Sequence, residues 1–419
     1  MAIVDVALAP VSPKGPIREV LAMPAFRYFW YSQLLVATVS GTIRFAFVWL
    51  VLDLTDWSPA VSFIGLAVGL PMTLLSLPAG VLSDRHDRRR MVAMCCVAGA
   101  AVLVATGVLV HAELVGVGWV ALLAFGIGSA IAVTAPALQA MVPALVPPER
   151  LVTGIALQGI GQNVAQMSGV LVGGLAIQLL GTAGAFELLA VMLLVAAGLQ
   201  KLVPRHASGS AGQRAETQEV RMLPAIREGL RYVLGREPLR TVVAIAVVGG
   251  VCGGTVQLLL PAIAKDEIGV GALAAALLFG GLGLGMIATT LFLAARHGVT
   301  RPGLLLGGFF TATCGPGMIL MGLTDLYAVV MAGMLIWGLG GGFVMTTQRM
   351  LLQRHTPDQL MGRVVSVHTL CLQGSFPIAA VLSALLVSQL GTSQSLVVMG
   401  TASLVLAILL GTRRPLREA

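Results

Sequence analysis

The sequence predicts an all-α membrane protein in which twelve transmembrane helices form two pseudo-symmetric six-helix bundles. Three observations predict this fold class: an apolar composition, a regular succession of long apolar segments, and a repeat between the two halves of the chain. Hydrophobic residues make up 57% of the 419 residues, and the mean hydropathy is +0.93. Soluble domains are only about half apolar, so a lipid bilayer is the environment that suits this composition.

Apolar segments long enough to cross a bilayer follow one another along the whole chain. A spanning helix needs roughly 20 mostly apolar residues, and each segment here ends at charge, Pro or Gly. The predicted spans are 26–52, 60–82, 91–111, 116–140, 152–179, 183–203, 240–263, 271–295, 302–323, 326–348, 364–389 and 393–411. They leave no room for a large soluble domain, and the 51 glycines are expected to let the helices pack closely.

The distribution of basic residues orients the predicted helices. When the N-terminus is placed in the cytosol, all of the 26 Lys and Arg lie on the cytosolic side except Lys265 and Arg44. Lys265 then lies outside, and Arg44 lies within the first span. This is the positive-inside bias of a bacterial cytoplasmic membrane protein. We therefore expect a multi-pass protein with both termini in the cytosol, and the net charge of +8 requires no nucleic-acid partner.

A polar segment separates two groups of six predicted spans. We expect an N-terminal bundle over 1–203, a cytosolic linker over 204–239 and a C-terminal bundle over 240–419. The second part of the linker predicts an amphipathic helix on the membrane surface. Its apolar residues recur at helical spacing and are Val220, Leu223, Ile226, Leu230 and Val233, with Arg221, Arg227 and Arg231 among the polar positions.

A repeat relates the two halves. Gln139 and Gln348 are 209 residues apart, and the same separation relates Pro148 to Pro357. Each pair lies at the end of a predicted span, the fourth in one half and the tenth in the other. Two six-helix units in the same orientation, with a site at their interface near the midplane, are typical of alternating-access transporters.

Charge is concentrated between the second and third spans. The residues there with a recognisable spacing are Gly80, Leu82, Asp84, Arg85, Arg88, Arg89 and Arg90. This spacing resembles the hallmark of the major facilitator superfamily, G-x-L-x-D-R-x-G-R-[RK]-[RK], with Asp87 in place of its second Gly. The resemblance extends over essentially the whole chain and implies the major facilitator fold.

The carboxylate in this stretch lies at a membrane boundary and needs a donor partner. The candidates for Asp84 are Arg88 or another basic residue of the loop, and the positive N-terminus of a helix from the other half. The resemblance places opposite it the helix that begins at Gly362–Arg363. We predict a contact that closes the cytosolic end in one conformation, here called the cytosolic latch, and a signal for topology alone is the alternative. The predicted latch consists of Gly80, Asp84, Arg85, Arg88 and Arg363.

Two further stretches resemble a prokaryotic exporter branch that includes siderophore, macrolide and multidrug efflux proteins. They read REGLRYVLGREPLR before the seventh span and LLQRHTPDQLMGRVVSV before the eleventh. The resemblance implies secondary efflux of an amphipathic small molecule by a monomer, with protons as one candidate coupling ion. The alternative is an importer, a facilitator or a lysolipid flippase of the same fold.

Motifs for catalysis or ATP use are absent from the sequence. It contains no P-loop, HExxH or GxSxG, and its six histidines are not paired at metal-ligand spacing. We therefore expect neither an enzyme nor a bound cofactor or metal. Energy for transport would come from a gradient, or the protein would equilibrate its substrate.

The fifth span carries two stripes. Small residues at Gly161, Ala165, Gly169 and Gly173 predict close packing against a neighbouring helix. Amides on an adjacent face either bond to neighbouring helices or line a wet cavity, and their number favours the cavity. The candidate cavity residues are Gln158, Gln162, Asn163 and Gln166, with Gln257, His368 and Gln373 as single candidates on other spans. For these three, a structural role between helices is the alternative.

Arg44 lies 18 residues into the first predicted span, far from its cytosolic end. An Arg at the centre of a span costs at least ~2.5–3.5 kcal/mol on insertion scales, so it should face protein or water and have a partner. Ser40, one turn earlier, occupies a position that is often acidic in the exporters this chain resembles. Arg44 is either structural, held by Glu187, amides or backbone carbonyls, or it attracts an anionic group of the substrate.

Overall fold

The computed structural model describes residues 16–55, 59–204, 222–295 and 302–411, which form helices joined by short connections without any strand in these ranges. The long helices are α2 (Pro24–Leu54), α3 (Pro59–Arg85), α4 (Arg88–His111), α5 (Val117–Leu145), α6 (Leu151–Leu202), α8 (Glu237–Ala262), α9 (Ala272–Ala295), α10 (Pro302–Gly322), α11 (Tyr327–His355), α12 (Asp358–Leu390) and α13 (Thr392–Gly411). The shorter elements are α1 (Pro16–Ala22), the 3₁₀-helix η1 (Pro148–Arg150), α7 (Met222–Leu234) and the π-helix η3 (Ile263–Glu267).

Every predicted span falls on one of the long helices. Within the described ranges, nine helices are long and apolar enough to cross a membrane. One of them contains α6, whose 52 residues hold two predicted spans. The break between them is at Gly181, where φ is 73°; glycine adopts this left-handed conformation without the strain that a Cβ would cause. When α6 is counted as two spans and α3 and α10 are added, the helices agree with the predicted arrangement of twelve spans.

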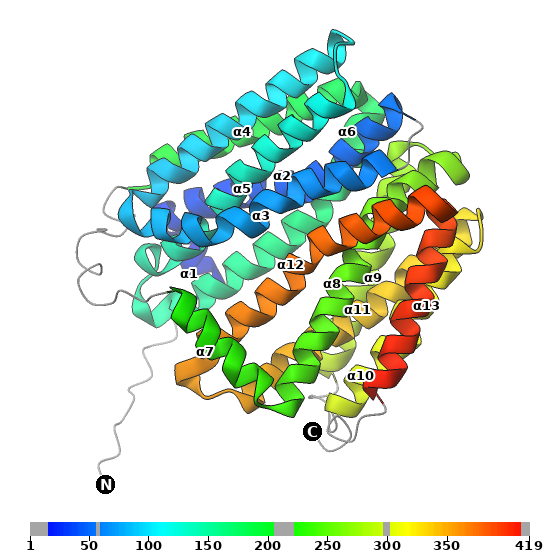
Figure 1. Cartoon of the computed structure of the whole chain (residues 1–419). Coiled ribbons are helices and arrows are strands. Elements are labelled where there is room, and N and C mark those ends of the chain that lie inside the picture. The colour runs from blue at the N-terminus through cyan, green and yellow to red at the C-terminus, as the bar shows by residue number, and fades with distance from the viewer. Residues whose placement is uncertain (1–15, 56–58, 205–221, 296–301, 412–419) are drawn as a thin grey trace.

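The packing of helices repeats between the halves. In the first half, α2 packs on α6, α3 on α5, and α4 on both α5 and α6. In the second half, α8 packs on α12, α9 on α11, and α10 on both α11 and α13. The pseudo-symmetry predicted from the sequence is therefore present in the order of helix contacts (Figure 1).

Two glycines show the repeat at the level of single residues. Gly41 on α2 and Gly250 on α8 have the same separation, 209 residues, as the glutamine pair noted in the sequence. A Cβ added at Gly41 would lie 2.0 Å from the carbonyl oxygen of Gln166, and one added at Gly250 would lie 2.4 Å from that of Leu372. Each glycine therefore lets the first helix of its half contact the backbone of the fifth.

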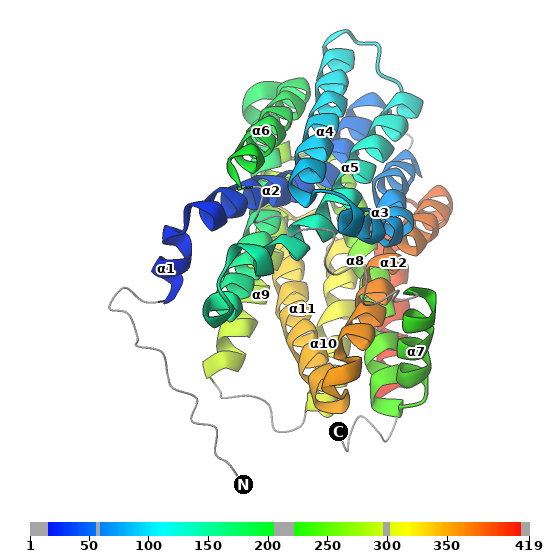
Figure 2. The same cartoon turned by 90° about the vertical axis from the view of Figure 1, so that its left-hand side faces the viewer.

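The linker contains the predicted amphipathic helix, α7, and residues 205–221, including Val220 and Arg221, lie outside the described residues. Val233 is fully buried, whereas Arg227 and Arg231 are exposed. The buried face packs on α12, and the two helices lie together in both views (Figure 1, Figure 2). The hydroxyl of Tyr232 donates to the carbonyl oxygen of His355 at 3.1 Å, which ties α7 to the end of α11.

The halves meet along a seam made by α2, α3 and α6 from one side and α8, α9 and α12 from the other. We call the end of the molecule that holds α7 and the start of α2 the linker end. The opposite end, which holds η3 and the end of α2, is the far end. Figure 1 shows the helices of the two halves inclined to one another, so that they converge toward the far end.

Candidate functional site

Arg44 lies on the seam, in the half of α2 that is nearer the far end. It precedes the end of α2, Leu54, by ten residues, which is about 15 Å of helix. Its Nη1 donates to Oε1 of Gln257 on α8, across the seam. Its guanidinium carbon lies 4.1 Å from the ring centroid of Phe376 on α12, a cation–π distance. The side chain is half-buried, and its Nε–H is buried without an acceptor among the described residues.

The ring of Phe376, which contacts the guanidinium of Arg44, packs against a glycine on each of two neighbouring helices. A Cβ added at Gly69 on α3 would lie 2.9 Å from Cδ1 of Phe376, and one added at Gly254 on α8 would lie 3.1 Å from Cδ2. The ring therefore fills the space that these glycines leave. Four helices, α2, α3, α8 and α12, build the surroundings of Arg44, and both halves contribute two of them.

The predicted amide stripe on α6 divides into two environments. Gln158 is buried, and its Nε2 donates to the backbone carbonyl oxygen of Leu138 at 3.3 Å. The backbone carbonyl oxygen of Gln158 accepts from Nε2 of Gln33 at 3.3 Å. Gln158 therefore lies in the packing of α2, α5 and α6, where a buried amide finds its partners, and its place in a cavity stays a prediction.

The other members of the stripe are more accessible. Gln162 is half-buried, while Asn163 and Gln166 are exposed. Their side chains form no hydrogen bond with other residues that the structure describes, and their role in a substrate pathway stays a prediction. The small-residue stripe beside them packs on α2 as predicted: a Cβ at Gly169 would lie 2.4 Å from the carbonyl oxygen of Thr38.

The two remaining single candidates lie on α12. Nε2 of His368 lies 3.0 Å from Oε1 of Gln348 on α11, within hydrogen-bond distance. Gln348 is buried, and its Nε2 has no acceptor among the described groups. Gln373 is exposed. Neither His368 nor Gln373 bonds to Arg44, so among the predicted cavity residues whose side chains the structure describes, Arg44 is joined to Gln257 alone.

The charged motif organises the linker end of the first half. Asp87, which departs from the family pattern, is the N-cap of α4, and its Oδ1 accepts from the backbone N–H of Arg89 at 3.0 Å. Nη1 of Arg88 donates to the carbonyl oxygen of Ala140 on α5 at 3.0 Å. Nη1 of Arg89 donates to that of Val203 at the end of α6 at 2.7 Å. These two arginines therefore tie α4 to α5 and to α6.

The predicted cytosolic latch is described only in part. The side chains of Asp84 and Arg85 and the surroundings of Gly80 lie outside the described residues. Arg363, its member on α12, forms an ion pair with Glu228 on α7. This carboxylate belongs to the linker, and its position in the sequence did not indicate a pairing with Arg363.

A second ion pair crosses the seam at the far end. Nζ of Lys265 on η3 lies 2.5 Å from Oδ1 of Asp53 near the end of α2. Thr182 on α6 donates to Oδ2 of the same carboxylate at 3.0 Å, and Nζ also lies 5.6 Å from the ring centroid of Trp49. Sequence reasoning missed this pair, although the isolated position of Lys265 outside the cytosolic side was a signal for it.

Close packing continues the seam from this ion pair toward Arg44. A Cβ at Gly174 on α6 would lie 2.8 Å from the carbonyl oxygen of Ala272 on α9, and one at Gly65 on α3 would lie 2.0 Å from Leu258 on α8. The rings of Phe45 on α2 and Phe279 on α9 meet edge to face, with centroids 6.2 Å apart. The halves are therefore in contact from the far end to the depth of Arg44.

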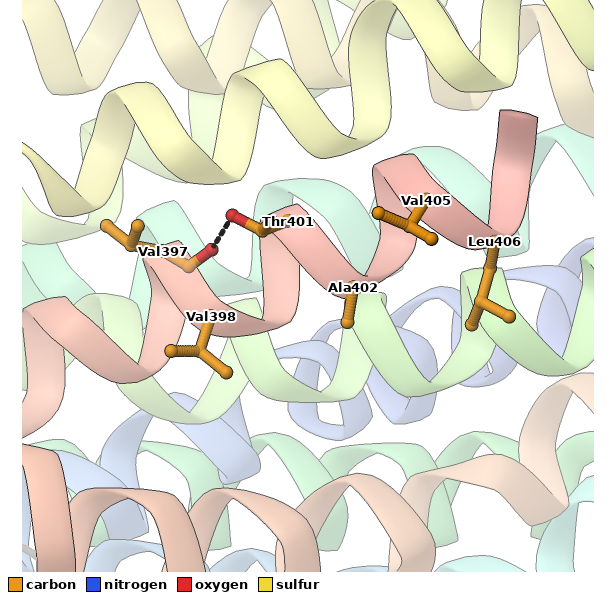
Figure 3. A pocket seen from close by; sticks show the side chains of 6 residues that line it. All are labelled: Val397, Val398, Thr401, Ala402, Val405 and Leu406. Carbon is orange, nitrogen blue, oxygen red and sulfur yellow. Dashed lines mark hydrogen bonds between the residues drawn. The ribbon is translucent and has the colours of Figure 1, made fainter. Parts of the chain in front are cut away.

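A shallow groove lies away from the seam, along one face of α13 (Figure 3). It is lined by Val397, Val398, Thr401, Ala402, Val405 and Leu406. The hydroxyl of Thr401 donates to the carbonyl oxygen of Val397 at 2.8 Å within the same helix. The groove therefore offers an apolar surface suited to acyl chains, and it contains no group that would orient a polar substrate.

Comparisons with known proteins agree with this architecture. The family described as transmembrane secretion effector matches residues 13–419. Macrolide efflux protein A of Streptococcus pyogenes is 24% identical over 399 residues, which cover 91% of this chain and 94% of that protein. A bacterial homologue of the human lysosomal transporter Spinster, in an inward-facing and unoccupied conformation, has a TM-score of 0.73 at 15% identity, over 93% of this chain and 97% of that one. The nucleoside transporter NupG has a TM-score of 0.70 at 12% identity, over 92% and 98% of the two chains.

Proposed function

Because the chain belongs to the transmembrane secretion effector family of the major facilitator superfamily, we propose that it exports an amphipathic small molecule by alternating access. The family and the fold are those of membrane transporters. The relative in Streptococcus pyogenes is named for macrolide efflux, which supports the outward direction. A single chain supplies both sides of the seam, so a monomer is sufficient for transport.

The observation that carries this proposal is the uneven seam. At the far end, the Asp53–Lys265 ion pair and the packing at Gly174 join the halves. At the linker end, the described groups bond within one half or to the linker: Arg363 pairs with Glu228 of α7, and Arg89 donates to Val203 of its own half. Alternating access requires contacts between the halves at one end to form as those at the other end break. The structure then corresponds to the state closed at the far end.

The positive-inside bias supports a cytosolic position for the linker end. The state described would then face inward, with the pathway open to cytosolic substrate. Gradient-driven transport suits a chain without an ATP-binding motif, and a proton gradient is the source that we propose.

Accumulation assays should reveal export. In a bacterial strain that lacks its own pumps, expression of the chain is expected to lower the steady-state accumulation of at least one amphipathic compound from a panel. Addition of a protonophore should restore accumulation if protons drive export. Higher accumulation in expressing cells would contradict the outward direction and indicate an importer. Unchanged accumulation across the panel would contradict the proposal.

Cysteine labelling should establish the orientation. A cysteine at Glu113, between α4 and α5, is expected to react with an impermeant maleimide in intact cells. A cysteine at the exposed Arg227 of α7 should react only after permeabilisation. A background in which the native cysteines are replaced by alanine is needed, and it also serves as the control. Labelling of position 227 in intact cells would reverse the proposed orientation.

A further inference from the structure

The charge of Arg44 lacks an anionic partner within the part of the chain that the structure describes. Two acids of the first half have other partners: Glu187 lies 3.2 Å from Nε2 of His111, and Asp53 pairs with Lys265. Gln257 supplies only a neutral carbonyl oxygen. The ring of Phe376 attracts the cation, but it does not neutralise the charge.

Arg44 also retains unused donors. A guanidinium has several N–H groups in a planar fork that matches a carboxylate or a phosphate. Nη1 is bonded to Gln257, whereas Nε–H is buried without an acceptor among the described residues. A buried donor left unpaired costs free energy. An anion on the unused side of the fork would remove this cost and neutralise the charge together.

Because Arg44 lies at the seam between the two halves, an anion bound to it would be affected by the movement of the halves during transport. Arg44 and Gln257 belong to different halves, and Phe376 belongs to the same half as Gln257. An anion bound to Arg44 would therefore lie at the seam, beside an aromatic ring that suits the apolar part of an amphipathic molecule. Its binding would differ between states in which the halves separate at different ends.

We infer that Arg44 binds the anionic group of the substrate, a carboxylate, sulfonate or phosphate carried on an apolar or aromatic body, with Phe376 contacting that body. This inference rests on the proposed transport function and names its substrate class. It differs from a cation-exporting site, which needs a buried carboxylate.

Binding by purified protein tests the inference without any transport step. The full chain in nanodiscs of zwitterionic lipid is titrated with naphthylacetate, its neutral amide and the cationic naphthylethylamine, and the melting temperature is followed. Wild-type protein is expected to respond most strongly to the anion. Replacement of Arg44 by glutamine should weaken anion binding by ~10-fold or more, the loss expected for a hydrogen bond to a charged group.

A second variant leaves Arg44 in place. Gln257→Glu puts a carboxylate where the amide accepts from Nη1, so an internal ion pair should form and anion binding should again fall by ~10-fold or more. This variant decides the case if Arg44→Gln does not fold. Gln394→Glu, at an exposed residue of α13, adds the same charge elsewhere and is expected to bind like wild type.

Equal or absent responses of wild-type protein to the three compounds would overturn the inference. So would an unchanged anion response in Gln257→Glu, because Arg44 would then be only a structural link between α2 and α8. Since the assay measures binding alone, these outcomes are separate from a failure of the accumulation screen.

Discussion

A covalent cross-link between positions 53 and 265 is expected to abolish transport. Asp53 and Lys265 form the ion pair that joins the halves at the far end. Alternating access requires this end to open once in each cycle, and an ion pair opens readily because its net contribution at a partly exposed site is about 0–1 kcal/mol. A covalent bond at the same place would hold the protein in the state that the structure describes.

The test uses cysteines at both positions in a background without native cysteines. A bifunctional methanethiosulfonate reagent should form the cross-link, seen by mobility after proteolysis in the linker, and should stop efflux of a substrate found in the screen. A reductant should restore it. His111 and Glu187 form a pair within the first half, so the same cross-link there is a matched control expected to leave transport active. Full activity of the cross-linked 53–265 protein would contradict alternating access at this end.

Gly41→Ala is expected to destabilise the protein strongly. The added Cβ would lie 2.0 Å from the carbonyl oxygen of Gln166, a backbone atom that a side-chain rotation cannot move away. Helices α2 and α6 would have to separate, and overpacking of this kind costs about 1–3 kcal/mol or more. Much of the bonding between these helices, including the hydrogen bond from Thr42 to Gly169 at 2.5 Å, would be disturbed.

The measurement is the melting temperature of purified protein, together with the fraction that elutes as a single species. Gly159→Ala is the matched control, because it makes the same substitution on α6 where nothing lies within 4 Å of the added Cβ. Its melting temperature should be unchanged or slightly higher, since alanine favours a helix over glycine. Equal stability of the two variants would show that α2 and α6 do not pack as closely as described.

Local patterns in the sequence were sufficient to locate the helices. Each predicted span falls on a helix, because the thickness of the hydrocarbon core fixes how many consecutive apolar residues a span needs. The linker helix α7 could be predicted equally well, since its apolar residues recur with the period of a helix. The separation of 209 residues between Gly41 and Gly250 is the one that already related Gln139 to Gln348, so the repeat too was present in the sequence.

The sequence identified residues of the candidate site, but it did not show which of them contact one another. The sequence identified Arg44 and Gln257 as unusual in apolar spans, yet nothing in their spacing paired residues 213 positions apart. It also could not tell that Gln158 is buried between α2, α5 and α6, where its amide donates to the carbonyl oxygen of Leu138. Hydropathy is the same for an amide that faces a pathway and one that faces a helix.

The sequence by itself therefore determined the positions of the long apolar helices and the repeat between the halves, because apolar length and period are properties of each segment alone. Only the tertiary structure decided that Arg44 meets Gln257 and Phe376, that Asp53 meets Lys265, and that Arg363 meets Glu228. These contacts depend on how each helix is rotated and how far it is shifted against its neighbours. Both quantities result from packing at positions such as Gly41 and Gly174, where the absence of a Cβ brings two backbones together.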